Sequence, residues 1–520
     1  MKLFKLLKNI NCRIFGLASI EIEGLYHNDK DVRENGLFFC INGKNFSGEN
    51  FVINAIKNGA VAIVTESEIT NIHGVTQILV KNVRKAMSLI ACNFYGNPAE
   101  KLKIIAVTGT NGKTTTTHMI AGLMQNLGRN CAIIGTNGAI YNNKKIETEM
   151  TTPDPIVLQK ILYKMERLGV EYVCMETSAH AIYLNKLDGI KFELVIFTNL
   201  TEDHLDYFLT MENYFQAKRK IFSKYFTKRA LINIDDEYGK RIYDSINVPK
   251  YTYSINSSSN FKSDNLKLEN FQQTFLFNGK FLKTNFLGEF NVYNLTSALA
   301  SLEILGFKVK DSQSIINKLN PVEGRFNTIV IKNKLFIIDY AHTPDGLENV
   351  LKLSKRIAGY ENLICVFGCG GNRETQKRSK MGEISSKYAN STIITSDNPR
   401  FEDRLKIAKD IEKGMTNSNY LTILDRSEAI KFAFKNSKEN DVILIAGKGA
   451  ENYIDEMGEK KPYSDFDEVR KLENWNDKLF KIIRIFFDCI FLFVGDISIY
   501  CCNAKKRKNQ ANDFALCWFA

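Results

Sequence analysis

The sequence lacks any spacing of cysteines that is typical of a metal site or of a disulfide framework. Its 11 cysteines are isolated among apolar residues, apart from the adjacent pair Cys501 and Cys502. This distribution predicts reduced, buried thiols in a cytoplasmic protein. The segment from Met1 to Leu17 contains lysines and short apolar stretches, but no run long enough for the apolar region of a signal peptide. We therefore expect no secretion.

The chain also lacks internal repeats and low-complexity domains, and the serine-rich stretch Ser257–Ser259 is expected to be a surface loop. Hydrophobic residues at 44% and charged residues at 25% are ordinary for globular proteins. The net charge of +12 is dispersed, except at residues 505–508, so anionic small-molecule substrates explain it as well as nucleic acid does. We expect no nucleic-acid partner. A chain of 520 residues is too long for a single core.

The C-terminal segment from Ile482 to Cys502 is strongly apolar and rich in Phe and Ile. Arg484 and Asp488 interrupt it, and charges inside a membrane-spanning helix are costly. We therefore expect an extra helix that docks on the protein or, through residues 480–508, on an anionic membrane surface. An extension without a function is an equal alternative.

Apolar runs alternate with helical patterns through most of the chain, which predicts an α/β protein. We expect domains at residues 1–100, 101–324 and 325–475, followed by an extension at 476–520. Phe51–Asn58 has a helical pattern. Predicted strands, which read as continuous apolar runs, are Leu37–Ile41, Ala60–Val64, Tyr172–Met175, Leu194–Phe197, Leu335–Ile338, Leu363–Phe367, Thr392–Thr395 and Val442–Ala446.

The strongest functional signal is the run Val107–Thr116, which reads VTGTNGKTTT. It follows the apolar stretch Ile104–Ala106 and precedes a helical pattern at His118–Leu127. Backbone N–H groups of such a turn converge on a phosphate, with Lys113 placed for the terminal phosphates and Thr114 for Mg²⁺. A standard phosphate loop has glycine where this run begins with valine. An ordinary glycine turn followed by an accidental Lys-Thr is the alternative interpretation.

Four polar segments follow predicted strands, at the sheet edge where open α/β proteins bind ligands. They are Met175–His180, Thr198–Asp206, Asp339–Asp345 and Thr395–Arg400. A carboxylate in the first can hold Mg²⁺, and the arginine that ends the last offers a planar fork that suits a carboxylate. Each segment alone also fits a turn with capping polar groups.

Taken in order, the phosphate loop and these segments resemble the Mur ligases over about residues 20–470. The resemblance is strongest to the type that adds the third amino acid of the peptidoglycan stem peptide. It implies a monomer with an N-terminal domain for a UDP moiety, a central P-loop-type ATPase domain with a parallel sheet, and a Rossmann-like C-terminal domain for the amino acid. The most specific matches are Thr108–Thr116, Asn199–Tyr207, Gly324–Arg325, Asp339–Asp345 and Asp397–Arg400.

The resemblance implies a reaction that uses ATP and Mg²⁺. A substrate carboxylate attacks the γ-phosphate to give an acyl phosphate, which an incoming amine converts into an amide with release of phosphate. The implied substrates are UDP-N-acetylmuramoyl-L-alanyl-D-glutamate and meso-2,6-diaminopimelate. Two alternatives remain open: a related enzyme that adds lysine or acts on another carboxylate, and a non-catalytic nucleotide-binding or membrane-associated scaffold.

The resemblance also assigns roles to individual residues. Lys218 is expected to carry a carbamate derived from CO2. The expected catalytic residues are Lys113, Glu176, His204 and Lys218, and the expected magnesium ligands are Thr114, Glu176, His204 and the carbamate of Lys218. Expected ATP contacts are Gly109, Thr110, Asn111, Gly112, Lys113, Thr114, Thr115, Asn199, Arg325 and His342. Expected UDP-substrate contacts are Thr151, Thr152 and Ser178, and expected amino-acid contacts are Arg373, Asp397, Asn398, Arg400, Gly447 and Glu451.

The chain departs from the pattern of the family at three places. Asn28-Asp29-Lys30 stands where the family usually has Asp-Ser-Arg, Ala450 replaces a histidine, and Ser379 replaces a proline. These changes bear more on the nucleotide substrate than on the ligase chemistry. The segment after Trp475 has no counterpart in the family.

Overall fold

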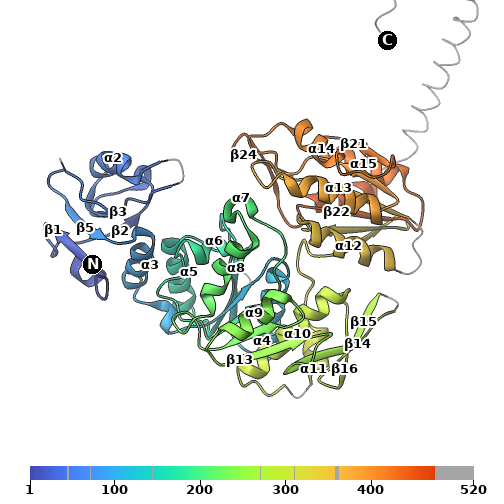
Figure 1. The fold of residues 1–520 in the computed structure, drawn as a ribbon, viewed down its shortest axis with the longest axis horizontal. Helices are drawn as coiled ribbons and strands as arrows, with labels where there is room; N and C mark the ends of the chain where they lie inside the picture. The colour runs from blue at the N-terminus through green and yellow to red at the C-terminus, as the bar shows by residue number, and fades with distance from the viewer. Residues whose placement is uncertain are drawn as a thin grey trace, which may run out of the picture. The chain divides into compact units, whose positions relative to one another are not determined.

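The computed structural model describes residues 1–43, 46–70, 72–142, 144–269, 271–309, 311–357 and 362–474. The chain divides into two compact units, Met1–Phe466 and Asp467–Ala520. The predicted extension at 476–520, with its expected helix and membrane contact, lies outside the described residues. Within the first unit, three large sheets follow one another along the chain (Figure 1).

The first sheet has the order β1-β5-β4-β3-β2 and is parallel except for β1. Its strands and helices are β1 (Cys12–Phe15), β2 (Gly24–Tyr26), β3 (Gly36–Phe39), β4 (Ala60–Thr65), β5 (Thr76–Val80), α1 (Leu3–Leu6), α2 (Val52–Lys57) and α3 (Val83–Phe94). Side chains alternate across the sheet, so Leu37 and Phe39 pack with α3 while Phe38 packs with α2. The predicted strand at Leu37–Ile41 ends two residues earlier, at Phe39.

The central sheet has the order β16-β15-β14-β13-β12-β11-β6-β10-β7-β8-β9. Its bounds are β6 (Lys103–Thr108), β7 (Cys131–Gly135), β8 (Gly138–Tyr141), β9 (Lys144–Ile146), β10 (Tyr172–Glu176), β11 (Leu194–Phe197), β12 (Ala230–Asn233), β13 (Lys250–Ser254), β14 (Phe261–Glu269), β15 (Gln272–Phe277) and β16 (Lys280–Thr284). The predicted parallel sheet is present from β7 to β14. Both edges are antiparallel, which the buried apolar runs did not indicate, because edge strands such as β9 are partly exposed.

Helices cover both faces of the central sheet (Figure 1). They are α4 (Lys113–Asn126), α5 (Pro155–Arg167), α6 (Ala179–Tyr183), α7 (Leu205–Phe208), α8 (Met211–Arg219), α9 (Glu237–Ser245), α10 (Glu289–Ile304) and α11 (Ser312–Asn317). Ile105 and Val107 of β6 pack with α4 and α10, whereas Ile104 and Ala106 pack with α5 and α8. Strand β6 is therefore buried on both sides, as its continuous apolar sequence predicts.

The third sheet has the order β17-β18-β22-β19-β20-β21 and is parallel except for β17. Its elements are β17 (Asn327–Ile331), β18 (Lys334–Asp339), β19 (Leu363–Phe367), β20 (Ser391–Ile394), β21 (Tyr420–Thr422), β22 (Val442–Ala446), α12 (Pro344–Arg356), α13 (Gln376–Tyr388), α14 (Arg404–Glu412) and α15 (Arg426–Asn436). A hairpin of β23 (Tyr453–Glu456) and β24 (Glu459–Pro462) follows, and α16 (Asp465–Lys471) comes after it. The predicted strand Thr392–Thr395 is shifted by one residue.

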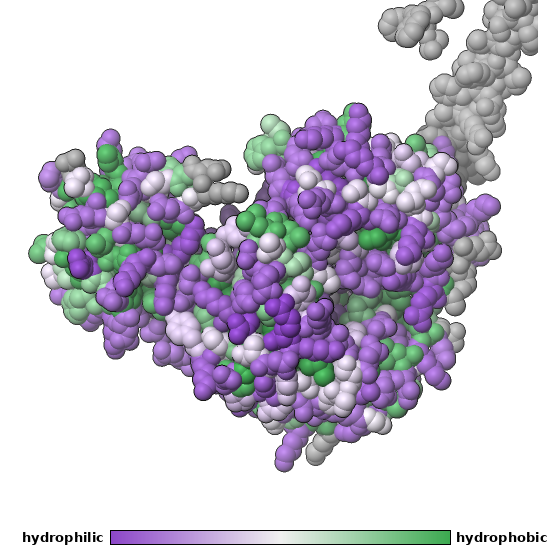
Figure 2. Space-filling view, in the orientation of Figure 1, coloured by the Kyte–Doolittle hydropathy of each residue, from purple (hydrophilic) through white to green (hydrophobic). Residues whose placement is uncertain are grey.

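The described cysteines, seven in number, are all free, in agreement with the expectation of reduced thiols. Among the described residues, no helix is long and apolar enough to cross a membrane. The face shown in Figure 2 is mainly hydrophilic, with small hydrophobic groups between the polar side chains.

Candidate active site

The phosphate loop connects β6 to α4, as predicted. Gly109 has φ +150°, and a side chain there would collide with the hydroxyl of Thr198. That hydroxyl donates to the carbonyl of Asn111 at 2.7 Å, and Asn199 Oδ1 accepts from the Asn111 N–H at 2.9 Å. Gly112, with φ +84°, ends the loop directly before α4. The end of β11 therefore holds the loop in shape, and the two glycines supply backbone angles that other residues rarely adopt.

Two lysines converge on the inner side of this loop. Lys113 Nζ donates to the carbonyls of Gly109 at 3.1 Å and Thr110 at 2.8 Å, and Lys218 Nζ donates to the same Gly109 carbonyl at 2.8 Å. Burial lowers the pKa of Lys113, against the raising effect of Glu176. Burial and the charge of Lys113 hold the pKa of Lys218 well below its ordinary value. The amine of Lys218 is therefore readily deprotonated in this environment.

Glu176, at the end of β10, lies at the start of α4. Its Oε2 accepts hydrogen bonds from the hydroxyls of Thr114 at 3.0 Å and Thr136 at 3.2 Å. Its Oε1 accepts from the N–H of Thr136 at 2.8 Å. Arg325 Nη2 donates to the same Thr114 hydroxyl at 2.8 Å, so a residue from before β17 completes the cluster. Thr136 was not singled out in the sequence, because a lone threonine after a strand carries no distinctive signal.

His204 stands at the start of α7 with a left-handed backbone, φ +58°. Its Nε2 lies 3.3 Å from Asp203 Oδ2, and Lys377 Nζ lies 3.8 Å from the other oxygen of Asp203. Burial lowers the pKa of His204 to about 3, which leaves a neutral imidazole at physiological pH. Burial alone would raise the pKa of Asp203, but nearby positive charges, including those of Lys377 and Lys113, hold it below its ordinary range.

The donors at this end of the cavity fit a magnesium ion that keeps substrate and water ligands. Among the described residues, no group of three or more His, Cys, Asp or Glu side chains is placed to enclose a metal. Mg²⁺ is commonly held by one or two carboxylates together with phosphate oxygens rather than by a closed protein cage. The Thr114 hydroxyl and the Glu176 carboxylate, 3.0 Å apart, form such an open donor set.

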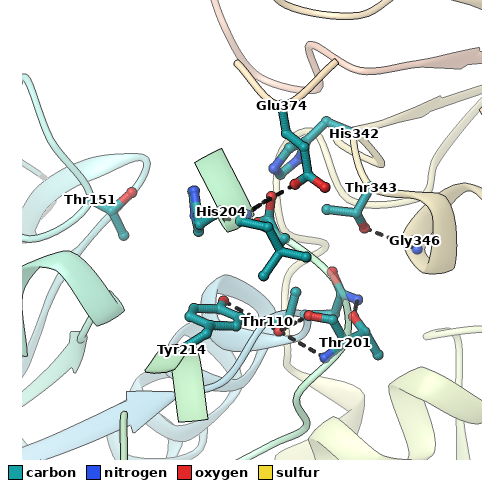
Figure 3. A network of polar contacts seen from close by, with 12 residues as sticks. Thr110, Thr151, Thr201, His204, Tyr214, His342, Thr343, Gly346 and Glu374 are labelled. Carbon is teal, nitrogen blue, oxygen red and sulfur yellow. Dashed lines mark hydrogen bonds and ion pairs between the residues drawn. The ribbon is translucent and has the colours of Figure 1, made fainter. Parts of the chain in front are cut away.

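Loops of the third sheet face the phosphate loop. Asn111 Nδ2 donates to Asp345 Oδ2 at 2.7 Å, and the guanidinium of Arg325 lies over the ring of Tyr340 at 4.6 Å. His342 Nδ1 is 2.9 Å from the Tyr340 carbonyl, and burial lowers its pKa to about 4. Figure 3 shows His342 on the opposite side of the site from Thr110 of the phosphate loop. Thr110 contacts Tyr214 and Thr201.

The Asp397–Arg400 turn is held by a buried cation. Lys448 Nζ donates to Asn398 Oδ1 and to Glu451 Oε2, both at 3.0 Å. Asn398 Nδ2 donates to Glu451 Oε2 at 2.8 Å, so these three residues form a closed ring of polar contacts. Arg400 Nη1 donates to the Gly371 carbonyl at 2.6 Å. Lys448 was not predicted as a site residue, because its neighbours in sequence indicated only a glycine-rich turn.

Most of the predicted residues line a single cavity of about 800 Å³. Those that line it are Thr110, Asn111, Gly112, Lys113, Thr114, Thr115, Thr151, Glu176, Ser178, Asn199, His204, Arg325, His342, Arg373, Asp397, Asn398, Arg400, Gly447 and Glu451. The other three predicted residues, Gly109, Thr152 and Lys218, are buried and do not line the cavity. Gly109 and Lys218 contact each other, and the hydroxyl of Thr152 donates to the Glu176 carbonyl at 2.9 Å.

The structure explains one of the three departures from the family pattern, the one at Asn28-Asp29-Lys30. Asp29 is buried, and its carboxylate accepts a hydrogen bond from Asn54 Nδ2. Its carbonyl accepts from Asn58 Nδ2 at 2.9 Å, while Asn28 caps the turn that follows it. Asp29 thus packs against α2, and its carboxylate is hydrogen-bonded to a residue of that helix. Nothing in the structure explains Ala450 or Ser379.

Comparison with known proteins identifies the family. Residues 21–95 match the Mur ligase family, catalytic domain; residues 107–302 match the Mur ligase middle domain; and residues 324–449 match the Mur ligase, glutamate ligase domain. The chain is 41% identical over 477 residues to UDP-N-acetylmuramoyl-L-alanyl-D-glutamate--2,6-diaminopimelate ligase 1 of Clostridium acetobutylicum, covering 90% of this chain and 98% of the relative. The chain belongs to the Mur ligase family.

Two further relatives agree with this result. The diaminopimelate ligase of Clostridium tetani is 39% identical over 464 residues, covering 87% of this chain and 95% of the relative. A solved structure of UDP-N-acetylmuramoyl-L-alanyl-D-glutamate--2,6-diaminopimelate ligase has a TM-score of 0.61 and 33% identity, covering 87% of this chain and 95% of that chain. This Mur ligase is an ATP-dependent, ADP-forming enzyme with the predicted three-domain α/β fold. The comparisons do not favour the alternatives of a scaffold or of another pathway.

Proposed function

We propose that this Mur ligase joins meso-2,6-diaminopimelate to UDP-N-acetylmuramoyl-L-alanyl-D-glutamate in the cytoplasm, as a monomer, during the synthesis of peptidoglycan precursors. One observation carries the proposal: the phosphate loop and the Asp397–Arg400 turn line the same cavity. An activated carboxylate and an amino acid can therefore meet there. The names of the relatives at 41% and 39% identity support the choice of substrates.

We assign one substrate to each of the three sheets. Residues 1–100 bind the UDP part of the substrate, residues 101–324 bind ATP, and residues 325–475 bind the amino acid. Thr151 and Ser178 line the cavity beside Glu176, which suits contacts with the substrate that carries the reacting carboxylate.

On the ATP side, we assign phosphate binding to the N–H groups of the loop and to Lys113, whose ammonium now contacts loop carbonyls within 3.1 Å. Arg325 and His342 complete the ATP contacts. Thr114, Glu176 and His204 would hold Mg²⁺, which when bound neutralises phosphate charge. The neutral imidazole of His204 has a free electron pair and suits such a role.

Lys218 is proposed to act as a carbamate rather than as a cation. Its buried amine has a pKa far below the ordinary value, so its nitrogen has an electron pair free to bond to the carbon of CO2. One N–H proton then leaves to solvent, and the side chain becomes an anion. That change would place a negative charge beside Lys113, and would provide oxygen atoms toward a second magnesium ion.

On the amino-acid side, Arg373 and Arg400 are proposed to bind carboxylates, and Glu451 the distal ammonium. A guanidinium binds a carboxylate through two parallel hydrogen bonds, which an ammonium such as that of lysine cannot exploit. Lysine lacks the distal carboxylate of diaminopimelate. Arg400 is thus the proposed basis for choosing between the two amino acids.

The decisive experiment measures phosphate release by the purified full chain with ATP, Mg²⁺ and UDP-N-acetylmuramoyl-L-alanyl-D-glutamate. We expect turnover with meso-diaminopimelate and much less with lysine. Arg400→Gln should weaken diaminopimelate binding about 10- to 100-fold, because a hydrogen bond to a charged group contributes roughly 1.5–3 kcal/mol. Equal turnover with lysine would refute the proposed specificity, and no turnover with either amino acid would refute the proposed function.

A further inference from the structure

Glu374 is a buried carboxylate inside the cavity that the proposed mechanism does not use. It follows Arg373 in the loop between β19 and α13, and its residue surface is only 7% exposed. Its side chain lines the cavity together with Lys113 and Arg373. Figure 3 shows Glu374 beside His342, reaching from the loop of the third sheet toward the segment that carries His204.

One oxygen of this carboxylate is unsatisfied. Oε2 accepts a hydrogen bond from the N–H of Leu205 at 3.4 Å. Oε1 is buried and has no hydrogen-bond partner among the residues that the structure describes. A buried charged oxygen without a partner is costly, so its position indicates a ligand that donates a hydrogen bond to it.

The neighbouring charges narrow the identity of that ligand. Glu202 is paired with Lys380 at 2.5 Å, and Asp203 lies near His204 and Lys377. Glu374 thus adds negative charge to a region whose other carboxylates already have partners. A carboxylate oxygen accepts hydrogen bonds, so an amine can donate to Oε1, whereas an ionised phosphate oxygen has no proton to donate.

The sequence position supports an amino acid as the source of that amine. Arg373 is proposed above to bind a carboxylate of the incoming amino acid, and Glu374 is the next residue. An α-amino acid carries its carboxylate and its amine on one carbon, so adjacent residues of opposite charge can contact both groups. The other carboxylate oxygen of Glu374, Oε2, accepts from the Leu205 N–H. Leu205 follows His204, a proposed magnesium ligand, so Glu374 lies near the part of the cavity proposed to bind the phosphates.

We propose that Oε1 of Glu374 accepts a hydrogen bond from the attacking amine of the incoming amino acid. This proposal rests on the proposed function. As the amine nitrogen bonds to the acyl carbon, its surplus proton passes to Oε1. The bond between that carbon and the phosphate oxygen then breaks, its electron pair leaves with the phosphate, and the phosphate can take up the proton. Glu374 returns to the carboxylate, and the amide is released.

The test compares Glu374→Gln with Glu202→Gln in the full chain. Both substitutions remove one carboxylate from the contact between the His204 segment and α13, but Glu202 is already paired with Lys380. Amide formation with diaminopimelate should fall at least about 100-fold in Glu374→Gln, since a positioned base contributes roughly 10²–10⁴-fold. Glu202→Gln should stay within about threefold of the wild type, because exposed ion pairs contribute little.

Hydroxylamine separates amine activation from acyl phosphate formation. It is a small nucleophile, uncharged at neutral pH, that can trap an acyl phosphate as a hydroxamate without a binding site. We expect hydroxamate from the wild type and from Glu374→Gln, and partial recovery of kcat in Glu374→Asp. Hydroxamate without loss of amide formation in Glu374→Gln would overturn this inference. Loss of both reactions in Glu374→Gln would show a structural role instead. No hydroxamate from the wild type would refute the proposed function itself.

Discussion

Two buried lysines, Lys218 behind the phosphate loop and Lys448 behind the Asp397–Arg400 turn, have opposite surroundings. Lys218 is 1% exposed, donates to the Gly109 carbonyl, and lies 4.7 Å from the ring centre of Tyr214. Lys448 is fully buried, and its ammonium contacts Asn398 Oδ1 and Glu451 Oε2. The two side chains are buried to nearly the same extent, so their surroundings differ only in the groups that contact each ammonium.

This difference separates a reactive amine from a structural cation. Lys218 contacts a carbonyl and a ring, and burial together with the nearby cation Lys113 lowers its pKa. The charge of Asp203 raises that pKa but does not outweigh the other two effects. Its charged form is therefore destabilised, and its pKa is low. Lys448 instead links the Asp397–Arg400 turn to Glu451, where its charge is matched. The same residue type thus has a proposed chemical role behind the phosphate loop and a structural role behind the Asp397–Arg400 turn.

The largest expected effect comes from Lys218→Met. Removing the nitrogen prevents carbamate formation, so kcat should fall at least about 100-fold, the scale of losing one charge-stabilising group. Thermal stability should be unchanged or higher, since an uncompensated buried amine is replaced by an apolar chain of similar length.

The matching control for Lys218→Met is CO2 dependence. Wild-type phosphate release should drop in CO2-depleted buffer and return with bicarbonate, whereas the variant should not respond. Wild-type rates that ignore CO2, or near-normal turnover by the variant, would rule out the carbamate.

Lys448→Met should show the opposite pattern. It leaves Glu451 and Asn398 Oδ1 without their cation, and breaking a buried ion pair typically costs about 3–5 kcal/mol. Because the Glu451 side chain is 21% exposed, solvent should reduce this cost. We expect a lower midpoint of thermal unfolding and a raised KM for diaminopimelate, with KM for ATP little changed. Lys448→Arg should restore part of the stability. Unchanged stability in Lys448→Met would break the comparison.

The two lysines also mark what the sequence could and could not predict. The strand, glycine turn and helix around Lys113 are a local pattern, so the loop and a helix after it were predicted, although α4 begins at Lys113, five residues before the predicted His118–Leu127. Most of the predicted residues that line the cavity lie in the phosphate loop and the strand-end segments, because parallel strands bring those ends together. Most of their individual roles, and the choice of Lys218, Arg325 and Arg373, came from the resemblance to the family. Lys448, Thr136 and Glu374 were missed, because their importance depends on partners up to about 170 residues away, such as Leu205 for Glu374. The antiparallel edges of the central sheet were missed for a similar reason, since short, partly exposed strands lack an apolar run.

The smallest effect concerns pH and extends the comparison to His342, a base whose pKa is lowered by burial although its side chain is partly exposed. Burial lowers the pKa of His342 to about 4, as it lowers that of Lys218, whereas an unfolded histidine titrates near 6.5. Between pH 4 and 6.5 His342 therefore binds more protons in the unfolded chain than in the folded chain, and its contribution to the free energy of unfolding falls as pH falls. One such histidine contributes at most about 1.4 kcal/mol per pH unit, and less here because its side chain is partly exposed. His342→Gln removes this term, so denaturant titrations at pH 6.5 and 5 should show a smaller loss of stability in the variant than in the wild type. An equal loss in both proteins would mean that His342 is not held neutral by burial, and that the low pKa of buried bases in this cavity is confined to the surroundings of Lys218.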